Sequence, residues 1–272
     1  MIGTSPLARE FWEQGKSASC PIYDMHGHMG PWAAIYFPRG QPEQMIATMD
    51  ECGVKMLVFS HHQALMAPDI GNRASIEAVR RFPCRFRAYC VINPNYPDRA
   101  EADLTAFEQH RDVFVGFKFL ADYHQVAISN ALYRPALEYA DRQGLLVLMH
   151  TWGGSPYDGA AQVRLLAERY SNAKLLLGHS CHGEWDAAVA LANEFPNLYL
   201  ELTAIFDDRG GLEKFAAEAG SQRMLFGTDL PWFDPHQAVG ALFSAHLSDE
   251  QIHDICHRNA EKLLAPWVVL PS

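Results

Sequence analysis

Eight short apolar or β-branched runs recur along the 272 residues, and the first residues of neighbouring runs lie 24 to 34 positions apart. That interval is about the length of one strand followed by one helix. Strands that are apolar along their whole length are typical of parallel sheets covered by helices. The predicted strands are Ile22–Met25, Met56–Phe59, Phe86–Ile92, Phe114–Phe119, Leu145–Met149, Lys174–Leu177, Leu198–Leu202 and Met224–Phe226.

Segments with helical spacing of apolar residues separate these strands. They include Pro42–Cys52, Ala74–Phe82, Arg99–His110, Ala131–Gln143, Gly159–Tyr170 and Glu184–Phe195. Eight such units in about 250 residues fit a (β/α)8 TIM barrel. An open dinucleotide-binding sheet would carry a glycine-rich loop after its first strand, and this chain has none. We therefore expect one α/β domain over residues 1–272, with an extra C-terminal helix at Asp249–Leu264 packed on the outside of the barrel.

The composition supports a folded domain and excludes several classes of protein. Hydrophobic residues make up 49% of the chain, enough for a sizeable core. The net charge of −10 argues against a nucleic-acid partner. No apolar run approaches the roughly 18 residues of a membrane helix, and charged residues interrupt the N-terminus, so we expect a cytoplasmic protein. The six cysteines form no Cys-X-X-Cys pair and are expected to be free, mostly buried thiols.

Polar side chains stand at or near the ends of seven of the eight predicted strands, which is where barrels of this type place their chemistry. They are Asp24, His26, His28, His61, His62, Lys118, His150, His179, Glu201, Thr228 and Asp229. His26 and His28 share one face of an extended strand, with Cα atoms roughly 6.6 Å apart. Adjacent His61 and His62 point to opposite sides, so at most one faces the barrel axis. Burying so many polar groups without a ligand would cost several kcal/mol, so the set predicts a metal site.

These motifs resemble the amidohydrolase superfamily over the whole chain, and within it the branch that contains aminocarboxymuconate-semialdehyde decarboxylase and many metal-dependent hydrolases. The segments that carry the resemblance are Asp24-Met25-His26-Gly27-His28, Gly116-Phe117-Lys118, Leu148-Met149-His150, Leu177-Gly178-His179, Phe226-Gly227-Thr228-Asp229 and Arg258-Asn259-Ala260-Glu261-Lys262-Leu263. The resemblance implies that His26, His28, His150 and Asp229 bind one divalent metal ion, usually zinc. It also implies that His179 is the acid/base histidine beside that ion.

The chemistry of the side chains supports the same allocation. Neutral imidazole and carboxylate suit zinc or a similar first-row ion, and the absence of cysteine from this strand-end pattern argues against an iron–sulfur cluster or an all-thiolate zinc site. A metal ion with an open coordination position lowers the pKa of bound water to near 7. Asp229 would accept the proton of that water. His179, with an ordinary pKa of about 6.5, would stabilise an oxyanion or transfer a proton.

Lys118 has two readings. In the first interpretation, Lys118 is carbamylated and a second metal ion involving His179 is bound, because binuclear members of the superfamily hold a carbamylated lysine between two metals at this strand position. An unmodified ammonium that binds a substrate carboxylate or pairs with Glu201 is the other, and we favour it. His182 either lines the pocket or is a solvated loop residue, and Cys181 is expected to be a bystander thiol.

The loops after the first, fifth and last strands are rich in aromatic residues. Trp32 and Trp152 are the expected substrate contacts, in a partly apolar pocket or at a subunit interface. Arg39, Arg73 and Arg209 join Lys118 as possible carboxylate anchors, which suggests a small carboxylated or cyclic metabolite.

Three functions compete for such a site. Hydrolysis of a small lactone, amide or ester by metal-activated water is the first expectation. The alternative is non-oxidative decarboxylation of a cyclic or unsaturated carboxylic acid, and the third possibility is a non-catalytic metabolite-binding barrel. We expect a small-molecule substrate and a homo-oligomer.

Overall fold

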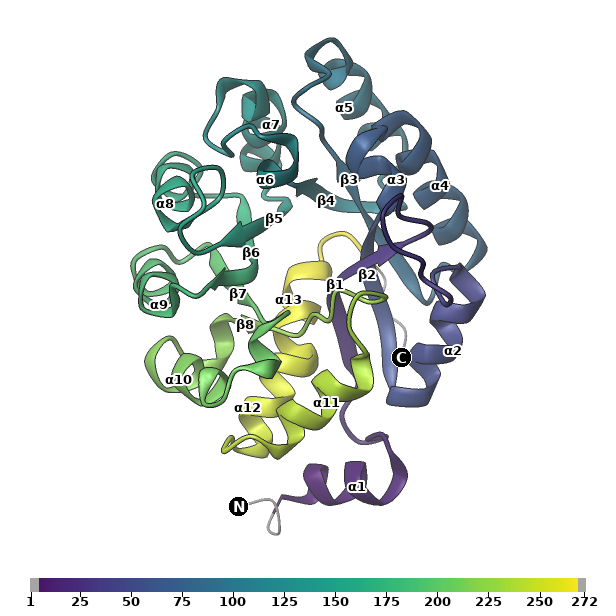
Figure 1. Cartoon of the computed structure of the whole chain (residues 1–272), viewed down its shortest axis with the longest axis vertical. Helices are drawn as coiled ribbons and strands as arrows, with labels where there is room; N and C mark the ends of the chain where they lie inside the picture. Colours follow the sequence, from purple (N-terminus) through teal and green to yellow (C-terminus); the bar gives the residue numbers. More distant parts are fainter. Residues whose placement is uncertain (1–4, 269–272) are drawn as a thin grey trace.

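The computed structural model describes residues 5–268 and contains eight parallel strands whose order in the sheet is their order in the chain. The predicted (β/α)8 barrel is confirmed, and Figure 1 shows the helices arranged around the ring of strands. The strands are β1 (Ile22–Met29), β2 (Val54–His61), β3 (Phe86–Val91), β4 (Phe114–Phe119), β5 (Leu146–Trp152), β6 (Lys174–His182), β7 (Leu198–Glu201) and β8 (Met224–Leu225).

Thirteen α-helices and several shorter helical turns complete the described chain. The α-helices are α1 (Pro6–Gln14), α2 (Pro42–Cys52), α3 (His62–Met66), α4 (Pro68–Arg81), α5 (Ala100–Gln109), α6 (Ala121–His124), α7 (Arg134–Gln143), α8 (Ala160–Arg169), α9 (Trp185–Glu194), α10 (Gly211–Glu218), α11 (Pro235–Ser244), α12 (Asp249–His253) and α13 (Asn259–Leu264). The turns are the 3₁₀ helices η2 (Pro97–Arg99), η3 (Ala131–Tyr133), η4 (Ile205–Asp207) and η5 (Ser221–Arg223), and a π-helical segment, η6 (Asp254–Arg258), that joins α12 to α13. Within this part of the chain, no helix has both the length and the apolar composition that crossing a membrane requires.

Helix α1 was not expected from the apolar spacing, although its sequence carries both end signals. The Ser5 hydroxyl accepts a hydrogen bond from the Ala8 amide at 3.0 Å, and Pro6 occupies the first turn. Gly15 ends the helix in the left-handed conformation, with φ of 75°. The helix packs on α11, where the rings of Phe11 and Phe243 are 5.6 Å apart.

One cluster of buried side chains draws on every strand and therefore fills the interior of the barrel. Its members are Tyr23, Met25, Met56, Val58, Tyr89, Val115, Leu146, Leu148, Leu176, Leu225 and the partly buried Tyr199. Ala260, Leu263 and Leu264 of α13 belong to the same cluster. The expectation that the C-terminal helix packs on the outside is therefore wrong. Its apolar face instead closes the end of the barrel where the strands begin, a choice of surface that apolar spacing alone does not specify.

The barrel closes between its last strand and its first. Because β8 is only two residues long, much of this contact lies beyond it: the Met25 amide donates to the Phe226 carbonyl at 2.9 Å, and the His28 amide donates to the Leu230 carbonyl at 2.6 Å. The buried Asp24 carboxyl adds a side-chain link, because it accepts hydrogen bonds from both the amide and the hydroxyl of Thr228. Residues about two hundred positions apart are thereby held in register.

The α13 helix offers a direct test of barrel closure by the C-terminal segment. Leu264→Ala should lower the free energy of unfolding by about 3 kcal/mol, because a fully buried leucine side chain would leave a cavity against the barrel interior. Lys262→Ala, on the exposed side of the same helix, is the matched control and should change stability by less than about 0.5 kcal/mol. Urea unfolding measures both. Equal stability of the two variants would contradict the placement of the helix.

Candidate metal centre and active site

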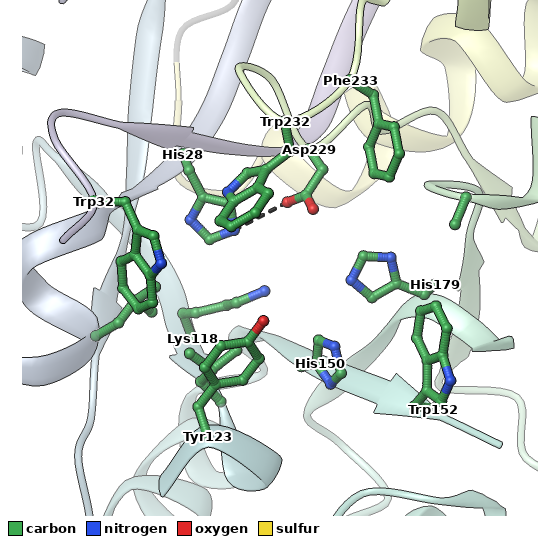
Figure 2. A pocket seen from close by; sticks show the side chains of 13 residues that line it. His28, Trp32, Lys118, Tyr123, His150, Trp152, His179, Asp229, Trp232 and Phe233 are labelled. Carbon is green, nitrogen blue, oxygen red and sulfur yellow. Dashed lines mark ion pairs between the residues drawn. The ribbon is translucent and has the colours of Figure 1, made fainter. Parts of the chain in front are cut away.

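A cavity of about 170 Å³ lies at the end of the barrel where the strands finish (Figure 2). Polar side chains line one part of it and large apolar side chains the rest. The lining residues are His28, Lys118, His150, His179 and Asp229, together with Trp32, Leu65, Leu120, Tyr123, Trp152, Ala204, Trp232 and Phe233. The predicted cluster at the strand ends therefore surrounds a real cavity.

His26, His28 and Asp229 bring three donor atoms together beside this cavity. Oδ1 of Asp229 lies 3.3 Å from Nε2 of His26 and 3.0 Å from Nε2 of His28. The ligand atoms of all three residues lie within 4.8 Å of one another, and all three residues are buried. The two histidines come from β1, which extends to Met29 and so includes both, while the aspartate follows β8 across the closure of the barrel.

A second ring of contacts orients the two imidazoles. Nδ1 of His26 lies 2.7 Å from Oε2 of Glu201, and Nδ1 of His28 lies 3.0 Å from the Ser60 hydroxyl. Protons on these Nδ1 atoms leave both Nε2 lone pairs facing the Asp229 carboxylate, and Nε2 of His26 also lies 2.9 Å from Nζ of Lys118. Such carboxylate–histidine pairs fix the tautomer of metal-binding histidines.

Glu201 is itself held firmly, and two glycines make room for it and for His26. Its Oε1 accepts hydrogen bonds from the Thr203 amide and hydroxyl at 2.7 and 2.6 Å. A Cβ at Gly227 would lie 2.1 Å from that same oxygen, and a Cβ at Gly178 would lie 2.7 Å from a backbone carbonyl and 3.2 Å from the His26 ring. The glycines of the Leu177-Gly178-His179 and Phe226-Gly227-Thr228-Asp229 motifs thus serve close packing around His26.

Burial and neighbouring groups together shift the pKa values of His26 and Asp229. Burial and the neighbouring Lys118 ammonium hold the pKa of His26 well below its ordinary value, so the ring is neutral. Burial alone would raise the pKa of Asp229, but His26 and His28 outweigh it and hold that pKa well below its ordinary value. A neutral imidazole at His26 and an ionised carboxylate at Asp229 are the protonation states that metal binding requires.

Lys118 is fully buried and extends from β4 into the cavity. Its Nζ lies 2.9 Å from Nε2 of His26, and Figure 2 shows the side chain directed toward the middle of the pocket. Burial lowers the pKa of Lys118 to about 8, although Asp229 and Glu201 oppose that shift. At neutral pH the side chain is therefore mainly an ammonium.

His150 lies on the pocket wall, apart from the three converging donors. Its Nδ1 is 2.9 Å from the buried Asp158 carboxylate, and its ring centre is 4.9 Å from that of His179. His150 is not within the group whose ligand atoms all approach to 4.8 Å, although the sequence analysis assigned it to the same metal. Asp158 orients its ring as Glu201 orients that of His26, so His150 stays a predicted ligand.

His179 directs its ring into the cavity (Figure 2), and its Nδ1 is buried without a hydrogen-bond partner. Burial and the nearby His150 hold the pKa of His179 well below its ordinary value. His179 and Asp229 adopt left-handed backbone conformations, with φ of 66° and 60°. Such conformations are uncommon in non-glycine residues and concentrate at functional sites. An unpaired ring nitrogen on a constrained backbone suits acid/base chemistry.

Two of the predicted substrate contacts line the cavity and a third does not. Trp32 and Trp152 line the cavity, whereas His182 does not: its Nε2 pairs with Asp208 at 2.9 Å, and its ring stacks on Trp152 at 4.6 Å between centroids. His182 thus stands behind the pocket wall. The lining residues of the described chain include one lysine and no arginine, so the suggested arginine anchors do not reach this cavity.

Both histidines at the end of β2 have structural contacts. His61 caps α3 by accepting from the Gln63 amide at 3.3 Å. His62 accepts from the Trp232 indole at 2.9 Å and stacks on the His28 ring, with centroids 4.9 Å apart. They support the pocket from outside its lining.

The three donors fit a divalent metal ion. With the Nδ1 atoms protonated, two imidazole lone pairs face a carboxylate oxygen that has no hydrogen-bond partner of its own. These electron pairs repel one another. The Lys118 ammonium, 2.9 Å from Nε2 of His26, offsets part of that repulsion, and Nε2 of His28 and the carboxylate oxygen remain to face a bound cation. Nitrogen and carboxylate oxygen donors suit zinc, manganese and similar first-row ions.

Residues 23–265 match the sequence profile described as amidohydrolase. The chain belongs to the amidohydrolase family. That match spans nearly the whole described barrel, from the start of β1 to the end of α13, and it confirms the family resemblance drawn from the strand-end motifs. No curated protein shows significant sequence similarity to the chain.

Several solved structures share the fold of this amidohydrolase. The 2,6-dihydroxybenzoate decarboxylase from Rhizobium has 16% sequence identity and a TM-score of 0.72, with 91% of this chain and 98% of that chain covered. The 5-carboxyvanillate decarboxylase from Sphingomonas paucimobilis has 14% identity and a TM-score of 0.71, with 92% and 100% covered. A dihydroxybenzoic acid decarboxylase from Polaromonas, solved with manganese and the inhibitor 2-nitroresorcinol, has 18% identity and a TM-score of 0.74, with 90% and 97% covered. At these identities the likeness is one of fold.

Two supporting carboxylates of this amidohydrolase site differ in how visible they are in the sequence. Glu201 is noticeable because it is a charged residue within an apolar strand. A carboxylate buried there needs a cation partner or a raised pKa. Burial does raise its pKa, and its partner is His26. Asp158 lies in the loop after β5 with no periodic context, so only the fold brings it to His150.

Glu201→Gln tests the metal centre of the amidohydrolase. The variant should bind Mn²⁺ about 10- to 100-fold more weakly, because the amide holds the His26 tautomer less well and removes a negative charge near the ion. Calorimetric titration of metal-free protein measures the affinity. His182→Ala, behind the pocket wall, should bind Mn²⁺ like the unmodified protein. Unchanged affinity in the Glu201 variant would contradict the assignment of His26 as a ligand.

Proposed function

We propose that this amidohydrolase is a metal-dependent, non-oxidative decarboxylase of a small hydroxylated aromatic carboxylic acid. The observation that carries the proposal is the buried Lys118 ammonium, which enters an aromatic-walled cavity beside three metal-type donors. The relatives of similar fold named as decarboxylases favour this reaction over the hydrolysis that the sequence analysis placed first.

The size and lining of the cavity suit one flat ring. A cavity of 150 Å³ is enough for benzene, and this one measures about 170 Å³. Trp32, Tyr123 and Trp152 offer aromatic surfaces for stacking, while Lys118 provides the charge for a carboxylate. A benzoate-like anion therefore matches both the shape and the charge of the pocket.

His26, His28 and Asp229 would hold the metal ion, with His150 on the adjoining wall as the predicted further ligand. A divalent ion bound there would supply positive charge to stabilise anionic oxygen atoms of the substrate. The manganese of the Polaromonas decarboxylase and the nitrogen-rich donors of this chain make manganese and zinc the two candidates.

His179 is the proposed proton donor. The negative charge of a bound substrate favours the protonated imidazole, which burial disfavours in the free protein. The imidazolium donates its proton to the ring carbon that bears the carboxylate. The bond between that carbon and the carboxylate then breaks, carbon dioxide leaves, and the bonding electron pair restores the aromatic ring. The reaction consumes one proton and requires no oxidant.

Hydrolysis of a lactone, amide or ester remains the second candidate, because the same three donors could hold a metal ion that activates water. Membership of an enzyme family speaks against the non-catalytic barrel. Homo-oligomer formation and a cytoplasmic location stay predictions.

The two reactions are separated by their products. Protein loaded with Mn²⁺ or Zn²⁺ should release carbon dioxide from dihydroxybenzoates or carboxyvanillates and leave aromatic lactones and esters intact. A coupled carbon dioxide assay, run beside chromatography of the ring products, follows both. Hydrolysis of a lactone with no carbon dioxide from any acid of the panel would overturn the proposal in favour of the hydrolase.

Lys118→Met keeps the length of the side chain and removes its charge. Loss of a charge-assisted contact worth about 1.5–3 kcal/mol should lower kcat/KM for the decarboxylated acid by about 10- to 150-fold. Lys55→Met, at an exposed position, is the control. Mn²⁺ affinity is measured on both variants, so that a loss of metal is recognised. Full activity of the Lys118 variant would exclude the ammonium as the carboxylate anchor.

A further inference from the structure

A second group of metal-type donors lies away from the cavity, at the end of the barrel where the strands begin. Cys20 stands two residues before β1, and His253 and His257 lie on the C-terminal helical segment formed by α12 and η6. One ligand atom from each of the three residues lies within 4.8 Å of the others. Cys20 is fully buried, and both histidines are partly buried.

Both sides of this group are fixed by the fold. The Cys20 amide donates to the Ser17 hydroxyl at 3.2 Å, and Pro21 follows it directly. On the helical side, the Ile255 carbonyl accepts from the Phe226 amide at 3.2 Å. The Asn259 side chain donates to the carbonyls of Ser221 and Met224, both at 2.8 Å. The donors are therefore presented by anchored backbone.

A carboxylate orients one of the two imidazoles. Nδ1 of His257 lies 3.1 Å from Oε1 of Glu261, one helical turn further on. A proton at that Nδ1 leaves the Nε2 lone pair of His257 facing Nδ1 of His253, at 2.9 Å. This repeats the carboxylate–histidine arrangement that Glu201 makes with His26 in the cavity, and that arrangement is typical of metal-binding histidines.

A second thiol and an uncommon helical geometry mark the same place. Cys256, a second fully buried thiol, immediately precedes His257 in the chain. Both Cys256 and His257 lie in the π-helical segment η6, a rare geometry that occurs often at functional sites.

We propose that Cys20, His253 and His257 bind a second divalent ion of the zinc class. One thiolate and two imidazoles suit a borderline-soft ion and do not suit magnesium or calcium, which prefer oxygen donors. The ion would join the segment before β1 to the helix that closes the barrel. At this end of a (β/α)8 barrel a bound ion serves stability.

Cobalt is the probe that distinguishes the two centres, because a thiolate bound to Co²⁺ gives a sulfur-to-metal charge-transfer band and the donors of the cavity include no cysteine. Metal-free full-length protein is titrated with Co²⁺ under reducing conditions. We expect the charge-transfer band to appear in the unmodified protein and to disappear on addition of Zn²⁺. Cys20→Ser should abolish the band, whereas Cys52→Ser, which alters a buried thiol at the C-terminal end of α2, should keep it.

A substitution at one of the histidines provides a second test, because these side chains are only partly buried whereas Cys20 is fully buried. His253→Gln changes a partly buried side chain on the helix and should weaken Co²⁺ binding, followed by the same band, at least tenfold. It should also reduce the rise in Tm that Zn²⁺ gives the unmodified protein. Absence of the band in the unmodified protein, or its persistence in Cys20→Ser or at full affinity in His253→Gln, would overturn the proposal. Neither result bears on decarboxylation, which is assayed separately.

Discussion

The site depends on the hydrogen bonds that close the barrel between β8 and β1. Met25 and His28 donate to carbonyls of the segment that follows β8, and Asp24 links the strand to Thr228. These contacts bring Asp229 to the two histidines of β1. A change of one residue in this register would point the histidines at the outer helices, because strand side chains alternate between faces. The same contacts therefore close the barrel and bring the three candidate metal ligands together.

Within this frame, the buried polar groups are arranged in two tiers. His26, His28 and His150 each turn one ring nitrogen to a fixed partner, namely Glu201, Ser60 or Asp158. The partners are buried and are not themselves part of the cavity lining, so they act by positioning the rings. The cost of burying these charges is offset by multiple hydrogen bonds, as the contacts of Glu201 with Thr203 show. Rigid ligand geometry is the result.

The sequence predicted the barrel well because strand and helix periodicity is local and recurs eight times. It also predicted the convergence of His26, His28 and Asp229, because a position at the end of a barrel strand specifies a place in space. Loop and helix residues carry no such information. Asp158, the thiol of Cys20 and the two helical histidines are meaningful only through contacts between distant segments. The prediction that the C-terminal helix packs on the outside of the barrel was wrong for the same reason. Apolar spacing shows that one face of a helix is buried, but it does not show which surface that face packs against.

Lys118 gives the pocket a simple chemical preference. An ammonium with no exposed surface loses its hydration, and a ligand restores that lost energy only if it carries a negative charge. An uncharged ring of identical outline would fill the same space without gaining the attraction between a carboxylate and this ammonium. Discrimination among compounds of similar size would therefore follow their ionisation, so that acids are retained while the corresponding esters and amides are rejected.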